Sequence, residues 1–395
     1  MFNVYIVLGL GYGDEGKGLV TDYLAATTPS PLVIRFNGGQ QAGHTVLHED
    51  GRKHVFSNFG SGTLRNISTY WSRYCTFSPS HFLEEYQELT PKTPFYLDPS
   101  CIISTHYDVL YNRAIETMRG QNRHGSCGVG HGATIERCKH SDLKLVANDL
   151  LNTRMYTSKL KLIKNYYRNK FKYNTNLDFN IFNHANEDLS FFQNISKLHD
   201  LLNIGFLKLK SFEELVNHRS QYLTLIFEGA QGILLDIHYG KSPYVTKSNT
   251  TSQNALSILR SIKVKNIDLN IFYITRSYLT RHGAGPFTEI PRGEINLINT
   301  QQETNIANEF QGNFKIGYLD IDKLNYSLSC DAKHSLNLKK NLVITCLDQQ
   351  ISNNITVRHK GSIRNIKYEG ISSKLEFAFN SCKYSFSPYS EKLKW

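Results

Sequence analysis

The sequence lacks the features that mark secreted proteins, membrane-spanning proteins and proteins stabilised by disulfides or a structural metal ion. No basic segment followed by an apolar run opens the chain, and no uninterrupted apolar stretch is long enough to span a bilayer. The seven cysteines are odd in number and include no Cys-x-x-Cys pair, which argues against a disulfide framework and a structural zinc site. We therefore expect a cytoplasmic protein with reduced cysteines.

Long charge blocks, internal repeats and a convincing interdomain linker are also missing. The formal net charge is +11, but the Lys and Arg residues are scattered rather than gathered in one stretch. A small substrate that bears phosphate uses positive charge as well as nucleic acid does, so we expect such a substrate and no nucleic-acid or membrane partner. We expect one domain over residues 1–395.

Short β-favouring runs followed by glycine-rich or polar loops predict an α/β fold with a large, mostly parallel central sheet flanked by helices. The sheet should carry a P-loop-like nucleotide site at the C-terminal ends of its strands. The expected strands are residues 4–8, 32–36, 223–227 and 269–274, with a helix at 19–25 after the first loop.

Two segments carry no recognisable chemical motif. Residues 151–212 are rich in Asn, Lys, Tyr and Phe with irregular apolar spacing, and they predict a divergent insert of helices and loops beside the main sheet. The tail after residue 348 has a β-rich composition with turns.

The loop at residues 11–18, GYGDEGKG, directly follows the first expected strand. Its glycines let backbone N–H groups approach a phosphate, the following helix N-terminus favours negative charge, and Lys17 can neutralise that charge. The spacing is not that of a Walker motif, which has a longer loop and a Ser or Thr after the Lys. A glycine-rich hairpin with a surface lysine is the alternative interpretation of this loop alone.

A second loop, NGGQQAGHT at residues 37–45, follows the second expected strand. It sets His44 and Thr45 beside three glycines. If both loops lie at one edge of the sheet, Asp14 and His44 can flank a phosphoryl group as a base and an acid.

These loops and three later stretches resemble, in the same order, the signature stretches of the adenylosuccinate synthetase family. The matching stretches are GDEGKG (13–18), GGQQAGHT (38–45), FEGAQG (227–232), YVT with SNTT (244–251) and TRHGAGPFTE (280–289). The resemblance implies a two-step reaction. A nucleoside triphosphate phosphorylates the 6-oxygen of a purine nucleoside monophosphate, and L-aspartate then displaces that phosphate.

The resemblance also implies a role for each matching residue. Asp14 would take the proton from purine N1 and bind Mg²⁺, for which the carbonyl of Gly43 would be a second ligand. His44 would be the acid that stabilises the transferring phosphoryl group, Lys17 would hold phosphates, and Gln231 would contact the 6-oxygen. Further contacts are implied for the triphosphate at Gly13, Glu15, Gly16, Gly18, Thr45 and Asp348, and for the monophosphate at Gln41, Ser126, Lys139, Thr246 and Asn249.

The loop at residues 125–130, GSCGVG, resembles the family's second monophosphate-binding loop. In the family an arginine just beyond this loop reaches across a dimer interface to the phosphate. The nearest equivalents here are Arg137 and Lys139, so we expect a homodimer whose sites are shared.

The chain departs from the family where aspartate should bind. Residues 308–320, NEFQGNFKIGYLD, stand where the family has Thr-Thr-Gly and several arginines, so the aspartate loop is expected at Gln311, Gly312 and Lys315. A lone lysine holds a carboxylate less well than a bidentate guanidinium, which leaves open a different amine. The family's arginine also contacts the ribose 2′-hydroxyl, so its loss removes one reason to prefer ribose.

This shortened loop resembles that of phage 2-aminoadenylosuccinate synthetases, which act on dGMP. Those enzymes typically replace the catalytic Asp by a smaller residue, whereas Asp14 is kept here. IMP is therefore slightly favoured as the acceptor, with dGMP as the alternative. His282, where the family usually has Val, is a departure without an interpretation at this level.

Recognition of the triphosphate base is also altered. The usual Thr-Lys-x-Asp becomes Thr345-Cys346-Leu347-Asp348, so both GTP and ATP remain open. A nucleotide-binding protein that has lost the chemistry is a further alternative, but Asp14, Lys17, His44 and Gln231 are all retained, which argues against it.

Overall fold

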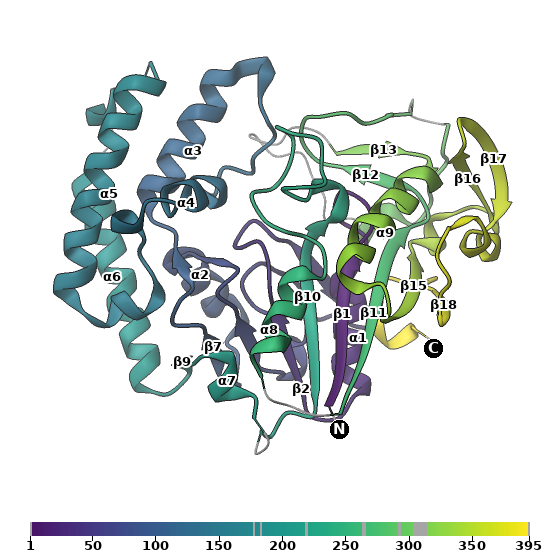
Figure 1. The fold of residues 1–395 in the computed structure, drawn as a ribbon, viewed down its shortest axis with the longest axis horizontal. Helices are drawn as coiled ribbons and strands as arrows, with labels where there is room; N and C mark the ends of the chain where they lie inside the picture. The colour runs from purple at the N-terminus through teal and green to yellow at the C-terminus, as the bar shows by residue number, and fades with distance from the viewer. Residues whose placement is uncertain are drawn as a thin grey trace.

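The computed structural model describes residues 2–176, 178–181, 184–217, 220–262, 266–290, 294–302 and 314–393. Within these residues the main feature is a nine-stranded sheet in the order β18-β15-β11-β1-β10-β2-β5-β7-β9 (Figure 1). Every neighbouring pair in it is parallel. The predicted α/β class with a mostly parallel sheet is confirmed.

The four strands expected from the sequence are all present. The strands of the sheet are β1 (Phe2–Gly9), β2 (Pro31–Arg35), β5 (Thr69–Trp71), β7 (Phe95–Leu97), β9 (Leu207–Leu209), β10 (Thr224–Gly232), β11 (Ile267–Arg276), β15 (Lys339–Thr345) and β18 (Ser381–Tyr384).

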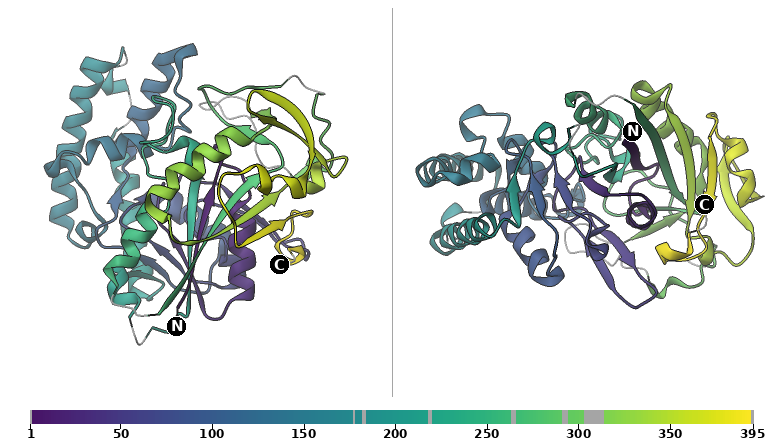
Figure 2. Two further views of the ribbon diagram at one scale, coloured as in Figure 1. Left: turned by 45° about the vertical axis from the view of Figure 1, so that its right-hand side comes forward. Right: turned by 90° about the horizontal axis from the view of Figure 1, so that it is seen from below.

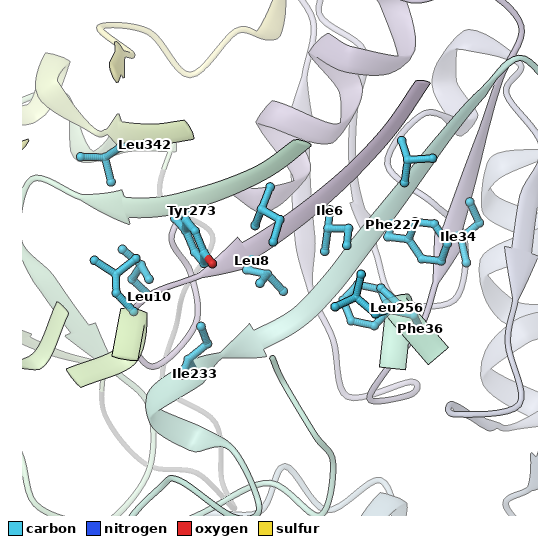
Figure 3. Close-up of a cluster of buried hydrophobic side chains, with 14 of the residues drawn as sticks. Ile6, Leu8, Leu10, Ile34, Phe36, Phe227, Ile233, Leu256, Tyr273 and Leu342 are labelled. Carbon is cyan, nitrogen blue, oxygen red and sulfur yellow. The ribbon is translucent and has the colours of Figure 1, made fainter. Parts of the chain in front are cut away.

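Helices cover both faces of the sheet, because alternate residues of each central strand point to opposite sides. Val7 packs with Val20 and Leu24 of α1 (Lys17–Thr27) on one face. Ile6 and Leu8 pack on the other face, toward α8 (Gln253–Ser261) and α9 (Ile321–Ser335). Figure 3 shows Ile6 and Leu8 within this second cluster, together with Phe227 and Leu256.

A helical layer lies beyond the β9 edge of the sheet, far from the C-terminal strands (Figures 1 and 2). Its helices are α2 (Pro79–Leu89), α3 (His106–Arg119), α4 (His131–Arg137), α5 (Thr153–Asn174) and α6 (His184–Asn203). The predicted insert is therefore helical, but it also contributes β9, which the sequence reading missed. Three residues are too few to show a strand period.

The C-terminal part adds strands, as its composition predicted. β16 (Asn354–His359) pairs with β17 (Ser362–Lys367) and with β14 (Leu319–Asp320), and β18 extends the main sheet beside β15. The remaining short elements are β3 (His44–Leu47), β4 (Lys53–Phe56), β6 (Thr76–Phe77), β8 (Ile102–Ile103), β12 (Leu279–Arg281), β13 (Lys315–Gly317) and α7 (Phe212–Leu215). No helix in the described ranges is both long and apolar enough to cross a membrane.

Candidate active site

A cavity of about 1060 Å³ lies where the loops after β1, β2 and β10 meet. It extends toward α3, α4 and α5, so the helical layer forms its far wall. The structure brings many of the predicted site residues together in its lining, namely Gly13, Asp14, Lys17, Gln41, Gly43, His44, Ser126, Lys139, Gln231 and Thr246.

The first glycine-rich loop is held from beneath by Glu15. Its carboxylate accepts hydrogen bonds from the N–H groups of Gly11 (3.0 Å) and Gly13 (2.8 Å), and it pairs with the ammonium of Lys17. Glu15 is 3% exposed and does not line the cavity. The carboxylate of Glu15 is therefore used to shape the loop, and the predicted contact of Glu15 with the nucleotide stays a prediction that this side-chain geometry does not support.

Two glycines of the first loop, Gly16 and Gly18, allow close packing within the chain and do not line the cavity. Gly16 has φ +89°, which favours glycine, and it caps α1. A Cβ on Gly18 would lie 3.0 Å from the carbonyl oxygen of Thr45 and 3.1 Å from Cβ of His44. α1 can therefore pack directly on β3, where His44 lies, while Gly16, Gly18 and Thr45 stay outside the lining.

Asp14 lies at the cavity with its side chain 21% exposed and its backbone in the left-handed region, φ 64°. One carboxylate oxygen, Oδ2, lies 3.3 Å from Nε2 of His282. Burial raises the pKa of Asp14, against the opposing effect of His282 and Arg276. A carboxylate with a raised pKa is a stronger base, which suits the removal of a proton from a weakly acidic ring nitrogen.

Arg276, the last residue of β11, is a site residue that the sequence reading missed. Its Nε donates to the main-chain oxygen of Asp14, and its Nη1 donates to the hydroxyl of Tyr278 at 2.8 Å. The guanidinium also lies 5.9 Å from the ring centroid of Phe314. Arg276 thus fixes the backbone that carries Asp14. A charged residue at the end of an apolar strand was the available signal.

His44 forms a buried pair with Glu228 of β10. Nδ1 of His44 lies 2.7 Å from Oε1 of Glu228, which also accepts a hydrogen bond from the hydroxyl of Ser61, while Oε2 accepts one from the N–H of Ser61 at 3.1 Å. Burial raises the pKa of Glu228, but His44, Arg35 and Ser61 outweigh it and hold this pKa at about 2. Glu228 is therefore ionised and fixes the His44 ring.

With Nδ1 of His44 bound to Glu228, Nε2 is the nitrogen left for chemistry in the cavity. Burial lowers the pKa of His44. A proton on Nε2 is therefore given up readily, as an acid near a transferring group requires. The sequence reading assigned no role to Glu228, although an acidic residue within an apolar strand was a usable signal.

Gln41 and Gln231 present unpaired polar atoms at the cavity. Gln231, the penultimate residue of β10, has φ 56°, and its Oε1 is buried with no hydrogen-bond partner among the residues that the structure describes. Neither amide atom of Gln41 has a partner in the same part of the chain. Buried polar groups are nearly always hydrogen-bonded, so these atoms indicate a place for a polar ligand.

The loop at residues 125–130 lies on α3. The hydroxyl of Ser126 donates to Oδ1 of Asn112 at 3.0 Å, and the N–H of Gly130 donates to the same oxygen. A Cβ on Gly125 would lie 2.7 Å from the backbone N of Ala284, so this loop closely approaches the segment after β12. Thr246 lines the cavity together with Ser126, as the monophosphate assignment requires.

Of the two cations expected to act across a dimer interface, only Lys139 is available. Arg137 is fully buried and bonds through Nε to Asp108 Oδ1 (2.9 Å) and through Nη2 to Asp108 Oδ2 (3.0 Å) and the carbonyl of Ile103 (2.8 Å). Arg137 as an intersubunit residue is therefore wrong, because its guanidinium holds the interior of its own chain. The Lys139 side chain is 65% exposed at the cavity, beside Glu136.

Several predicted residues lie away from the cavity. Asn249 is engaged locally, since Nδ2 donates to Gln253 and Oδ1 accepts from Thr251, so its direct contact with the monophosphate is not supported by this geometry. Asp348 follows β15, and burial raises its pKa. Lys315 lies opposite Arg281 in the antiparallel backbone pairing of β12 and β13. Gln311 and Gly312 lie outside the described residues.

The cavity offers hard oxygen donors to a divalent cation. Asp14 and Gly43 line the same cavity, and no cluster of three or more His, Cys, Asp or Glu residues suited to a metal occurs in the described ranges. One carboxylate and a carbonyl oxygen, completed by substrate phosphates and water, is a typical Mg²⁺ environment. These residues therefore fit Mg²⁺ better than a structural transition metal.

Comparison with known proteins gives a consistent result. The family model of adenylosuccinate synthetase matches residues 6–376. An adenylosuccinate synthetase of Buchnera aphidicola subsp. Baizongia pistaciae is 30% identical over 377 residues, covering 93% of this chain and 83% of the relative. One from Psychromonas ingrahamii is 34% identical over 302 residues, covering 74% of this chain and 65% of the relative.

Two solved structures share the fold. The fully ligated adenylosuccinate synthetase of Plasmodium falciparum superposes with a TM-score of 0.76 at 19% identity, covering both chains fully. The succinoaminodeoxyadenylate synthetase of cyanophage S-2L, solved with dGMP and with dATP as an energy donor, gives 0.62 at 15% identity, covering 100% of this chain and 95% of the other. At these identities the likeness concerns the fold.

Proposed function

Because the chain belongs to the adenylosuccinate synthetase family, we propose that it couples L-aspartate to C6 of a 6-oxopurine nucleoside monophosphate at the expense of a nucleoside triphosphate. The protein is thus a ligase that forms a C–N bond. The observation that carries the proposal is one cavity lined by Asp14, Lys17, His44 and Gln231. A base, two cationic or acidic groups and an amide are the set that this chemistry needs.

The side chains divide the work as follows. Asp14 takes the proton from purine N1, which makes the 6-oxygen nucleophilic toward the γ-phosphorus. His44, oriented by Glu228 at 2.7 Å, and Lys17 stabilise the negative charge of the transferring phosphoryl group. Gln231 holds the 6-oxygen through its amide. The amine of aspartate then attacks C6, and the phosphate on the 6-oxygen leaves.

Mg²⁺ fits the oxygen donors of Asp14 and Gly43, and when bound it would neutralise charge on the polyphosphate. Arg276 keeps the backbone of Asp14 in place, and His282 keeps its carboxylate in place. The loop shape set by Glu15 keeps Lys17 at the cavity wall.

We favour hypoxanthine over guanine as the base. The Asp14 carboxylate is held by His282, and its backbone is held by Arg276, so it cannot easily move aside for a 2-amino group. The alternative acceptor is dGMP. A matrix of IMP, dIMP, GMP and dGMP against GTP and ATP, each with aspartate and read by mass spectrometry of the product, separates these substrates.

The triphosphate is GTP or ATP. Asp348 offers a carboxylate to the base, while Cys346 stands where the family has a base-flanking lysine. The carboxylate of aspartate has Lys315 as a cation at the start of β13, next to Arg281. The same substrate matrix, repeated with other amino acids at fixed nucleotide, identifies the amine.

We also propose a homodimer in which Lys139 completes the neighbouring site. The exposed position of Lys139 and the interior role of Arg137 support this choice. Mixing Lys139→Ala with Asp14→Asn should restore activity through hybrid dimers that hold one intact site, whereas Lys161→Ala, on an exposed face of α5, should by itself have no effect. Failure of rescue at every mixing ratio would place the whole site in one chain.

The decisive experiment measures phosphate release. A ligase releases phosphate when monophosphate, triphosphate and aspartate are all present. A nucleotide-binding protein or an idle hydrolase would show no joint dependence on monophosphate and aspartate, and that result would reject the proposed function.

A further inference from the structure

His131 is a buried polar residue of the cavity wall that the reaction above leaves without a role. It is the first residue of α4, directly after the loop at residues 125–130, and it is 6% exposed. Its Nδ1 lies 2.9 Å from the hydroxyl oxygen of Thr76. Its Nε2 is buried and has no hydrogen-bond partner among the residues that the structure describes.

The hydrogen-bond network around Thr76 fixes which nitrogen of His131 carries the proton. Gln40 donates from Nε2 to the carbonyl of Val129 (2.9 Å), and a carbonyl can only accept. The other amide atom of Gln40 is therefore its oxygen, which accepts the hydroxyl hydrogen of Thr76 at 3.1 Å. The hydroxyl of Thr76 donates its only hydrogen to Gln40, so its oxygen accepts a hydrogen bond from Nδ1–H of His131.

His131 is consequently a neutral imidazole with its lone pair on Nε2. Burial lowers its pKa to about 4, which keeps the ring uncharged at neutral pH. An unpaired buried acceptor is costly, and a ligand that brings an O–H or N–H group relieves the cost. A phosphate dianion brings no hydrogen and would meet the lone pair unfavourably.

The position of His131 narrows the identity of this donor. His131 follows the loop that carries Ser126, and a Cβ on the next residue, Gly132, would lie 3.4 Å from Cγ of Lys247, beside Thr246. His131 thus lies at the end of the cavity assigned to the monophosphate. The base presents its N1–H to Asp14, and the sugar lies between base and phosphate by its covalent structure.

Resting on the proposed function, we propose that His131 Nε2 accepts a hydrogen bond from a sugar hydroxyl of the acceptor nucleotide and so acts as a specificity-determining residue. Thr76 and Gln40 are positioning residues, because they act through His131 by fixing its tautomer. Gln41, Ser126, Lys139 and Thr246, the other residues proposed for the monophosphate, supply no neutral ring acceptor of this kind.

Two substitutions test the roles of the two ring nitrogens of His131 separately. His131→Asn can keep a donor to Thr76 but has no atom at the Nε2 position. His131→Gln can place its Oε1 acceptor near the Nε2 position but loses the donor to Thr76. A role in folding alone would make both variants unstable, whereas the proposed contact predicts that Gln, and not Asn, retains recognition of the sugar.

The test measures dissociation constants by titration calorimetry on the full chain. IMP, 2′-deoxy-IMP and 3′-deoxy-IMP are titrated into the wild type and both variants, with the guanine series as a parallel set. Loss of the contacted hydroxyl should weaken binding to the wild type by about three- to tenfold. In His131→Asn, binding of the nucleotide that carries the contacted hydroxyl should weaken by a similar factor. This variant should bind the form that lacks the hydroxyl at least as tightly as the form that carries it.

Three outcomes contradict the proposal in different ways. If His131→Asn loses the same affinity for IMP and for both deoxy forms, His131 contacts no sugar hydroxyl. Proton uptake on binding that disappears in His131→Asn, measured in buffers of different ionisation enthalpy, would show an imidazolium on the phosphate instead. If no purine monophosphate binds the wild type, the proposed function itself fails. That result differs from binding that His131→Asn leaves unchanged, which rejects the role of His131 alone.

Discussion

Replacing Glu228 by Gln should impair both catalysis and folding, because this buried carboxylate orients His44 and balances Arg35. Relative to an ordinary glutamate near 4.3, its pKa of about 2 is lower by roughly two units. At 1.36 kcal/mol per unit, the ionised carboxylate contributes about 3 kcal/mol to folding at neutral pH. The amide keeps the shape but removes the charge, and it leaves a buried guanidinium without its counter-charge.

The stability effect has a defined dependence on pH. The folded-state pKa of Glu228 is lowered, so its contribution is complete above the unfolded-state pKa and is lost as pH falls through the folded-state value. Urea titrations should therefore give a difference of about 3 kcal/mol between wild type and Glu228→Gln that stays constant from pH 8 to about pH 6. The difference should shrink as the pH falls below about 4.5.

The catalytic effect follows from the hydrogen bond to His44. A hydrogen bond to a charged group contributes about 1.5–3 kcal/mol, so kcat should fall roughly 10- to 100-fold. Glu85→Gln is the matched control, because Glu85 is also buried, accepts hydrogen bonds from the N–H groups of Ser57 and Asn58 and from His54, and does not line the cavity. That variant should lose stability but keep kcat.

Wild-type kcat in Glu228→Gln, measured at a temperature where the variant is folded, would refute the role assigned to this pair. A similar loss of kcat in Glu85→Gln would show that the assay reports stability rather than chemistry. A stability difference that grows on acidification would contradict the assignment of an ionised Glu228.

Four further outcomes are expected. Asp14→Asn should lower ligation by about 10²–10⁴-fold with little change in thermal stability, since the amide is nearly isosteric but takes no proton; wild-type turnover would reject Asp14 as the base. Arg276→Lys should lower kcat by about tenfold, because one ammonium cannot replace the fork that binds the Asp14 carbonyl and Tyr278, and an unchanged kcat would dismiss that link. Ribo and deoxyribo forms of the preferred monophosphate should react within roughly tenfold of each other, about 1.4 kcal/mol, and a preference of a hundredfold in steady-state assays would contradict this. Asp22→Asn should cost several kcal/mol in urea denaturation, because the buried carboxylate joins Arg65 and His48, and a cost below about 1 kcal/mol would show that this cluster is not a stability element.

The sequence alone determined the fold class and the two loops that carry the chemistry. β-favouring runs followed by glycines have a local cause, since glycine conformations and strand propensities are set within a few residues. Asp14, Lys17 and His44 could be named for that reason. The order of five stretches along the chain then indicated the family, which needs no three-dimensional information.

The tertiary structure decided which side chains are free to act. Arg137 and Lys139 are two residues apart on one segment, yet one is consumed by Asp108 and the other is exposed. Glu15 was expected at the nucleotide but serves the loop beneath it. Burial and partner choice depend on residues distant in sequence, so a motif cannot reveal them.

The same reason explains the residues that were missed. Glu228 lies 184 positions from His44, and Arg276 lies 262 positions from Asp14, so only the parallel sheet brings each pair together. The tautomer of His131 depends on Thr76, Gln40 and Val129, which come from three separate segments. The sequence determined which groups are present, and the packing of the sheet and the helical layer determined which of them meet at the cavity.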